Sequence, residues 1–163
     1  MTETRHDIRV RRASPADLAE LDALFGRTYP ALLKEDYPPS VLVTAIPVMA
    51  RAQPSLLSSP TYFIAERQGS IVGAGGWSAR SGQVSRVRHV VADHRLARQG
   101  IGRAIFGTIF ATARAAGHHR MNCEATRTAV PFYRALGFGE EAEATIQLAP
   151  GIDFPIIRMA RDL

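Results

Sequence analysis

Alternating and helical spacings of apolar residues predict a strand and then a helix at the start of the chain. Apolar and charged residues alternate from Ile8 to Arg12, as they do in a half-buried strand. The run Ser14–Asp17 then supplies an N-cap, a proline in the first turn and an acid at the third helical position. We therefore expect a helix whose buried face carries Leu18, Leu21, Leu24 and Phe25.

The segment Tyr29–Pro60 has a less regular pattern. Prolines 38 and 39, followed by Ser40, predict the start of a second helix. Its apolar positions are Val41, Leu42, Ala45 and Ile46. We expect Pro47 to break or kink this helix, because proline lacks the backbone N–H and clashes with the preceding turn.

Three runs typical of strands follow, separated by turn signals at residues 67–70 and 81–82: Tyr62–Glu66, Ile71–Trp77 and Val84–Ala92. Sequential strands with short turns predict an antiparallel meander. The glycines of Gly73–Gly76 permit a bulge or a close backbone approach. With Trp77 they either line an acceptor site or simply bend the strand.

The second half of the chain alternates helices and strands. A helix begins at the Gly100–Gly102 turn and ends at Gly117, and a compact helix begins near Thr128 and ends at Gly137. The predicted strands of this half are Arg120–Ala125, Ala142–Leu148 and Phe154–Ala160. The order β-α-α-β-β-β-α-β-α-β-β, with no repeat or linker, predicts one α+β domain over residues 1–163 with a mixed sheet of about seven strands.

Composition is that of an ordinary globular protein, with 46% hydrophobic and 21% charged residues in a chain of 163. No apolar run approaches a membrane span, and Met1–Arg12 lacks the apolar core of a signal peptide, so we expect a cytoplasmic protein without membrane contacts. Cys123 is the only cysteine, which excludes an internal disulfide and a cysteine-cluster metal site. We expect no metal, and a core position for Cys123.

The net charge of +5 is concentrated in one part of the chain. Eight arginines and a single acid, Asp93, lie between Arg80 and Arg120, whereas the remainder carries slightly more acids than bases. This segment should face a polyanion. Its aromatic residues, Phe106 and Phe110, fall in a helical pattern, so stacking on single-stranded nucleic acid is disfavoured and a small polyphosphate fits better.

A candidate polyphosphate site lies at Arg98–Arg103, between a strand and the start of a helix. Helix starts present free backbone N–H groups, and glycines let a phosphate approach the backbone. Neither the Gly-Lys-Ser/Thr of a nucleotidase loop nor the third glycine of a dinucleotide fingerprint is present, since Ile105 stands there. Two glycines making a tight turn are the alternative, which the flanking Arg95, Arg98 and Arg103 disfavour.

Two motifs in this half resemble those of the GCN5-related N-acetyltransferase (GNAT) family. Ala97–Gly102 is similar to the cofactor motif Arg/Gln-x-x-Gly-x-Gly/Ala, although Ala97 departs at its first position. Ala129–Phe138 is similar to the later signature Asn-Ala-x-x-Phe-Tyr-x-x-x-Gly-Phe, with Thr128 in place of the Asn. The motifs and the element order together cover almost the whole chain.

The resemblance implies an acetyl-CoA-dependent acyltransferase in which the fourth and fifth strands splay apart to hold the cofactor. Coenzyme A would then bind the backbone of Val90, Val91 and Ala92 and the loop residues Arg98, Gln99, Gly100, Ile101, Gly102 and Arg103, with Thr128 nearby. No metal is implied. An amine would attack the thioester directly in a ternary complex, and a backbone N–H near Val91 could hold the oxyanion.

The resemblance also implies that Tyr133 donates a proton to the departing thiolate; the alternative is a core tyrosine. Removal of a proton from the amine falls to His89 or Glu124. His89 has the better intrinsic pKa, about 6.5. A packed histidine and a salt-bridged glutamate are the respective alternatives. His118 and His119, after the helix-ending Gly117, are expected at the surface.

The resemblance implies that the acceptor is a primary amine of a small molecule, peptide or protein. Tyr29–Pro60 is where the family varies most, and it is rich in proline and aromatic residues and poor in charge. We expect it, with Tyr29 and Tyr37 as a wall, to suit a partly apolar amine better than a polycation. A catalytically silent acyl-CoA sensor and a nucleic-acid binder are the other classes considered, and a homodimer is possible.

Overall fold

The computed structural model describes residues 7–163; residues 1–6, which include part of the sequence used to argue against a signal peptide, lie outside it. Its strands are β1 (Arg9–Arg12), β2 (Tyr62–Arg67), β3 (Ser70–Ser81), β4 (Val84–Ala92), β5 (Arg120–Ala125), β6 (Gly139–Ala149) and β7 (Ile152–Asp162). Its helices are α1 (Leu18–Leu33), α2 (Pro39–Met49), α3 (Pro54–Leu57), α4 (Ile101–Ala115) and α5 (Val130–Ala135). The predicted element order is confirmed, with α3 as an addition.

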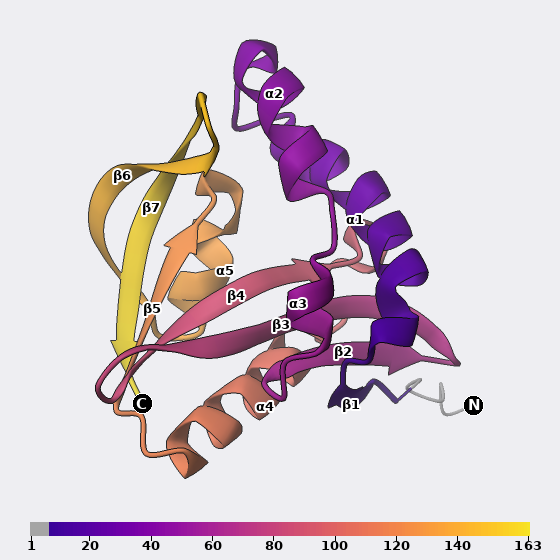
Figure 1. The fold of residues 1–163 in the computed structure, drawn as a ribbon, viewed down its shortest axis with the longest axis vertical. Helices are drawn as coiled ribbons and strands as arrows, with labels where there is room; N and C mark the ends of the chain where they lie inside the picture. The colour runs from indigo at the N-terminus through magenta and orange to yellow at the C-terminus, as the bar shows by residue number, and fades with distance from the viewer. Residues whose placement is uncertain (1–6) are drawn as a thin grey trace.

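The strands form one seven-stranded sheet in the order β1-β2-β3-β4-β5-β7-β6 (Figure 1). All neighbouring strands are antiparallel except β4 and β5, which run parallel. The β4–β5 pairing covers only the register Val84↔Arg120 to Arg86↔Asn122. Because β4 runs on to Ala92 and β5 to Ala125, the two strands diverge beyond this point, and the predicted splay is confirmed.

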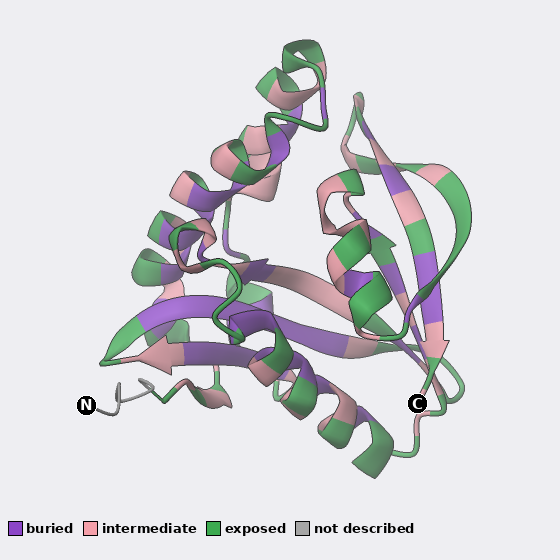
Figure 2. Cartoon of the chain, turned by 180° about the vertical axis from the view of Figure 1, so that it is seen from behind, coloured by how far each residue is buried: buried purple, intermediate pink, exposed green. Residues whose placement is uncertain are grey.

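Helices cover both faces of the sheet. One apolar core joins α1, α2 and α3 to the sheet residues Tyr62, Ile64, Ala74, Phe154 and Ile156. The other joins α4 and α5 to Phe63, Val72, Trp77, Met121, Cys123 and Met159. Figure 2 shows the central strands β2 and β3 buried over most of their length, whereas the edge strand β6 is largely exposed.

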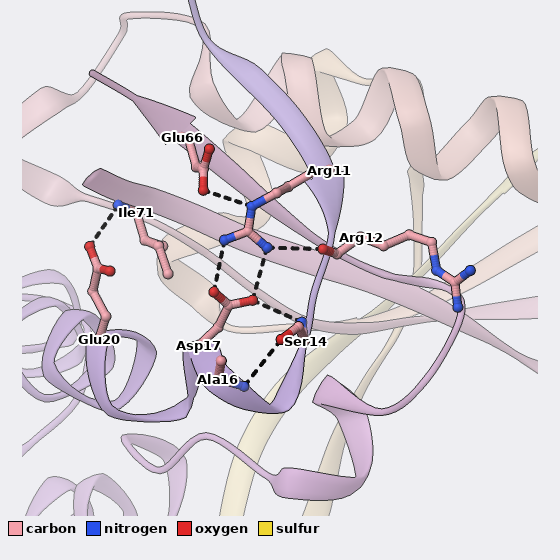
Figure 3. A network of polar contacts seen from close by, with 8 residues as sticks. All are labelled: Arg11, Arg12, Ser14, Ala16, Asp17, Glu20, Glu66 and Ile71. Atoms are coloured by element: carbon pink, nitrogen blue, oxygen red, sulfur yellow. Dashed lines mark hydrogen bonds and ion pairs between the residues drawn. The ribbon is translucent and has the colours of Figure 1, made fainter. Parts of the chain in front are cut away.

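The capping box that the sequence predicts caps the 3₁₀ turn Pro15–Asp17, which leads directly into α1 (Figure 3). Asp17 accepts hydrogen bonds from the Ser14 backbone N–H and from both terminal nitrogens of Arg11, and Arg11 also binds Glu66 on β2. The Arg11 hydrogen bonds lower the pKa of Asp17 despite its partial burial. Further along α1, Glu20 accepts from the Ile71 backbone N–H. These contacts orient α1 across the sheet.

The prediction was that Pro47 breaks or kinks the second helix, and the break is wrong. Helix α2 runs through Pro47 to Met49, and the backbone N–H of Ala50 still donates to Ile46. Proline removes only its own hydrogen bond, which near a C-terminus affects a single turn. Packing of the buried Ala45 and its neighbours against the α1 core supports the remainder of the helix.

Candidate active site

A cavity of about 760 Å³ lies where β4 and β5 diverge. Its lining comes from both strands, from the turn before α4, and from α1, α2 and α5. Every site residue predicted from the sequence lines it: Tyr133, Glu124, His89, Val90, Val91, Ala92, Arg98, Gln99, Gly100, Ile101, Gly102, Arg103 and Thr128. The fold thus gathers residues that are up to 44 positions apart in the chain, from His89 to Tyr133.

The cavity edge of β4 carries a β-bulge. Ala74 pairs with Val91 and Gly76 with Arg88, so His89 and Val90 together oppose the single residue Gly75. His89 has a left-handed φ of 44°, and a Cβ on Gly75 would lie 2.8 Å from Cγ2 of Val90. Gly75 therefore makes room for the bulge, and bulges re-aim groups next to active sites. The strand glycines thus accommodate a bend of the sheet. Neither they nor Trp77 line the cavity.

The side chain of His89 is held on three sides. Its ring lies 4.4 Å from that of Phe25 and 5.8 Å from that of Tyr29, between centroids, and Nε2 is 3.0 Å from the Met49 carbonyl oxygen. Burial lowers its pKa from 6.5 to about 4, so the imidazole is neutral at pH 7. A tautomer with Nε2–H donating to Met49 leaves Nδ1 as the acceptor.

Glu124 takes a different position, on the face of β5 away from α4. Its carboxylate lies 3.6 Å from a terminal nitrogen of Arg86, and its side chain is about one-third exposed. His89 is packed and Glu124 forms a salt bridge, as the structural alternatives for these residues predict. Both side chains nevertheless line the cavity. The choice of base between them stays a prediction.

Tyr133 lies on α5 at the opposite wall of the cavity, within a cluster of aromatic rings. Centroids of Phe106, Phe132 and Phe138 are 5.7, 5.3 and 5.4 Å from its ring, all edge-to-face. Burial raises its pKa well above 10, so the phenol keeps its proton at neutral pH. Burial likewise raises the pKa of the Cys123 thiol to about 12, which suits a core residue and not a thiolate nucleophile.

The turn before α4 uses its two glycines for different purposes. Gly100 is left-handed, with φ 83°, and a Cβ there would meet no neighbour. A Cβ on Gly102, by contrast, would lie 2.6 Å from the ring of Phe132. The first glycine makes the turn and the second permits α5 to approach α4.

Of the three arginines flanking this turn, only two face the cavity. Arg98 and Arg103 line it, and within residues 7–163 neither makes an ion pair. Arg95 instead binds Asp93 through two nitrogens, at 3.1 and 2.8 Å. The expectation that Arg95 flanks the phosphate site is therefore corrected.

Asp93 is a residue whose importance sequence reasoning missed. Its side chain is only 1% exposed, it caps the 3₁₀ turn His94–Leu96, and it also binds Arg27 of α1. These hydrogen bonds, led by that from Arg95, lower its pKa to about 2. A lone acid in an arginine-rich segment was the available signal. Asp93 ties the end of β4 to the loop before α4.

Two expectations about the acceptor wall have different outcomes. Tyr29 lines the cavity, together with Leu32, Leu33 and Met49. Tyr37 does not: it stacks on Phe154, donates to the Pro155 carbonyl oxygen and accepts from the Arg127 backbone N–H. Thr128 donates to Asp36 at 2.7 Å, so the loop between α1 and α2 is fastened to the C-terminal half of the chain.

The sheet splays between its parallel strands, with a glycine turn and a helix start at one end of the gap and a buried phenol on the wall. This arrangement is that of a protein that binds a phosphate-containing ligand in a split sheet. The family comparison makes this specific. The family model for the acetyltransferase (GNAT) domain matches residues 41–159, and the chain belongs to that family. It is therefore an acyltransferase that uses acetyl-CoA.

Solved structures of known relatives share the fold at low sequence identity. The PaiA N-acetyltransferase of Thermoplasma acidophilum in complex with coenzyme A has a TM-score of 0.75 and 14% identity, covering 96% of this chain and 99% of that one. A GCN5-related N-acetyltransferase from Rhodopseudomonas palustris gives 0.76 and 18%, covering 100% and 99%. The N-acetylglutamate synthase of Neisseria gonorrhoeae, complexed with coenzyme A and N-acetyl-glutamate, gives 0.66 and 15%, covering 96% of this chain and 35% of that one. No curated protein sequence matches the chain.

Residues 7–163 contain no group of three or more His, Cys, Asp or Glu side chains placed to hold a metal ion. No helix among them has the length and apolar character needed to cross a membrane.

Proposed function

We propose that the protein transfers the acetyl group of acetyl-CoA to a primary amine by direct attack in a ternary complex. The observation that carries this proposal is the single cavity that contacts the α4 turn at one end and His89, Glu124 and Tyr133 further along. Acetyl-CoA supplies an activated thioester. The amine nitrogen forms a bond to the acetyl carbon, the carbon–sulfur bond breaks, and the products are the N-acetylated amine and free CoA thiol.

The α4 turn is suited to the cofactor pyrophosphate. The backbone N–H groups that open α4 have no partner within the helix, and the helix dipole adds positive potential there. Arg98 and Arg103 lack carboxylate partners among the described residues, so their charges are available to phosphate. The pantetheine chain would follow the β4 edge at Val90–Ala92, where β5 has diverged and leaves this edge unpaired.

Proton transfers complete the reaction. The amine loses a proton to Nδ1 of His89, to Glu124 or to water, and the thiolate takes one from Tyr133. A phenol with a raised pKa remains protonated until a strong base such as a thiolate forms beside it. The oxyanion of the attacked carbonyl would lie near the backbone N–H of Val91, beyond the bulge.

The main alternative is a sensor that binds acyl-CoA without turnover; the departures at Ala97 and Thr128 argue mildly for it, and the retained Tyr133 argues against it. In this structure Thr128 is engaged with Asp36. A single N-acetyltransferase domain, a cytoplasmic location and a homodimeric state stay predictions, as do the absence of nucleic-acid and membrane partners. The sensor and the enzyme differ in one observable, the release of free CoA.

A thiol-release assay with acetyl-CoA and a panel of amines tests the proposal. Tyr133→Phe should leave acetyl-CoA affinity unchanged and lower kcat by about 10- to 10⁴-fold, because only a transition-state interaction is removed. Phe138→Leu, in the same aromatic cluster but outside the cavity lining, is the matched packing control and should keep most of kcat. Saturable binding of acetyl-CoA without thiol release from any amine would establish the sensor instead.

A further inference from the structure

An arginine-rich patch lies on the face of the sheet that carries α1 and α2, next to the reaction centre. Side chains alternate between faces along a strand, and Trp77, Val87, Met121, Cys123 and Met159 all pack into the α4 core. Residues offset by one position from these point to the other face. The patch consists of Arg80, Arg86, Arg88, Asn122, Glu124 and Arg158.

The patch is continuous with the active-site cavity. Arg86, Arg88 and Glu124 line that cavity. A smaller adjoining hollow of about 30 Å³ is lined by Arg80, Arg86, Asn122, Cys123, Glu124, Glu141, Arg158 and Met159. Because the two share Arg86, Cys123 and Glu124, a molecule bound at the reaction centre can reach the patch.

The arginines of the patch exceed its carboxylates. Arg86 pairs with Glu124, and Glu141, which lines the smaller hollow, pairs with Arg120 at 3.8 Å. Within residues 7–163, Arg80, Arg88 and Arg158 make no ion pair, and Arg88 donates a hydrogen bond to the Ser78 hydroxyl at 3.3 Å. Arg134, an exposed arginine outside the patch, does pair, with Glu140. The unpaired guanidinium groups therefore leave an excess of positive charge beside a single carboxylate.

The other walls of the cavity restrict the ligand further. Tyr29, Leu32, Leu33 and Met49 present apolar surface on the α1 and α2 side. A ligand that matches all three features has an ammonium group for Glu124, an anionic group for the arginines and an apolar substituent. Guanidinium forks bind carboxylates through paired hydrogen bonds.

We propose that the acceptor is an amino acid with an apolar side chain, acetylated on its α-amino nitrogen and held through its carboxylate by Arg88, Arg86 and Arg158. The inference rests on the proposed N-acetyltransferase function. The reaction consumes an amino acid and acetyl-CoA, and yields an N-acetyl amino acid, CoA thiol and one proton. The carboxylate directs the nitrogen toward His89, Glu124 and the thioester.

Matched substrates test the need for a carboxylate. L-phenylalanine, L-leucine and L-methionine are each compared with their amides in the thiol-release assay. The kcat/KM of the acids should exceed that of the amides by about 10- to 100-fold, because the amides lose a hydrogen-bonded contact between charged groups. The α-ammonium groups of the amides lose their proton more readily than those of the acids. A preference for the acids would therefore not come from amine basicity. Equal rates, or faster amides, would overturn the proposal.

Two variants test the residues. Arg88→Gln and Arg158→Gln should each lower kcat/KM for the acids by about 10-fold or more, with amide rates and the KM for acetyl-CoA unchanged. Arg134→Gln, outside the cavity, is the matched control and should behave as the parent. Equal losses for acid and amide would show a structural role and contradict the inference.

A binding measurement separates this inference from the function on which it rests. Calorimetric titration of L-leucine and L-leucinamide into the protein saturated with CoA requires no turnover. The acid should bind more tightly in the parent and lose that advantage in Arg158→Gln. If phosphoethanolamine outperforms every amino acid tenfold, the anion is a phosphate and the carboxylate assignment is wrong. If acetyl-CoA itself does not bind, the proposed function fails first.

Discussion

The contact between Gly102 and Phe132 makes a quantitative prediction about the turn before α4. Gly102→Ala places a Cβ 2.6 Å from both Cε2 and Cζ of Phe132, well inside van der Waals contact. The ring is edge-to-face with Phe106 and with Tyr133, so moving it away from the new Cβ disturbs both contacts. Overpacking of this kind costs about 1–3 kcal/mol.

Gly107→Ala is the matched control on the same helix. It is exposed, and a Cβ there would have no neighbour within 4 Å. Both substitutions stabilise the helix by about 0.5–1 kcal/mol, because alanine has the higher helix propensity. Only Gly102→Ala is also destabilised by overpacking. The free energy of unfolding of Gly102→Ala should therefore lie about 1–3 kcal/mol below that of Gly107→Ala.

Thermal unfolding followed by circular dichroism measures the difference. For a chain of this length, 1 kcal/mol corresponds to about 2–4 °C in Tm, so Gly102→Ala should unfold about 2–12 °C below Gly107→Ala. Displacement of Phe132 should also lower kcat through Tyr133, whereas Gly107→Ala should leave kcat unchanged. A Tm of Gly102→Ala at or above that of Gly107→Ala would refute the account of why glycine stands at this position.

Three further predictions concern groups whose surroundings are set by the tertiary structure. Asp93→Asn should lower the free energy of unfolding by about 2–3 kcal/mol at pH 7. Because the folded-state pKa of Asp93 is about 2, below its ordinary 3.8, this contribution is present above pH 3.8 and is lost as the pH falls toward 2. The stabilities of parent and variant should therefore converge in acid denaturation. His89 is partly buried at the cavity and neutral, and its folded-state pKa of about 4 lies below the ordinary 6.5. The parent should therefore lose up to about 3 kcal/mol of unfolding free energy as the pH falls from 6.5 to 4, and His89→Gln should lack that loss. Identical pH dependence of the two proteins in urea titrations would count against this prediction. Tyr37→Phe should lower the free energy of unfolding by about 1–3 kcal/mol, because the Pro155 carbonyl and the Arg127 N–H lose their shared partner. An unchanged Tm for Tyr37→Phe would show that water replaces the hydroxyl without cost.

Local signals in the sequence determined most of the elements and pointed to residues that line the cavity. The capping box at Ser14, the left-handed glycines 117 and 137 and the strand Arg120–Ala125 appear where they were predicted, because each depends on backbone geometry within a few residues. All the residues predicted for the site line one cavity, and their roles in binding and catalysis stay predictions.

Tertiary packing decided what local patterns do not encode. Helix α2 continues through Pro47 because Ala45 and its apolar neighbours pack against the α1 core. Glycine is needed at position 102 because the ring of Phe132, thirty positions later in the chain, packs where a Cβ would lie. The pKa of His89 depends on Phe25, Tyr29 and Met49, which only the folded chain brings together, and Asp93 removes Arg95 from the cavity. Burial and ion pairing act through space, so the electrostatic state of the site and the arginine patch beside it are set by the fold.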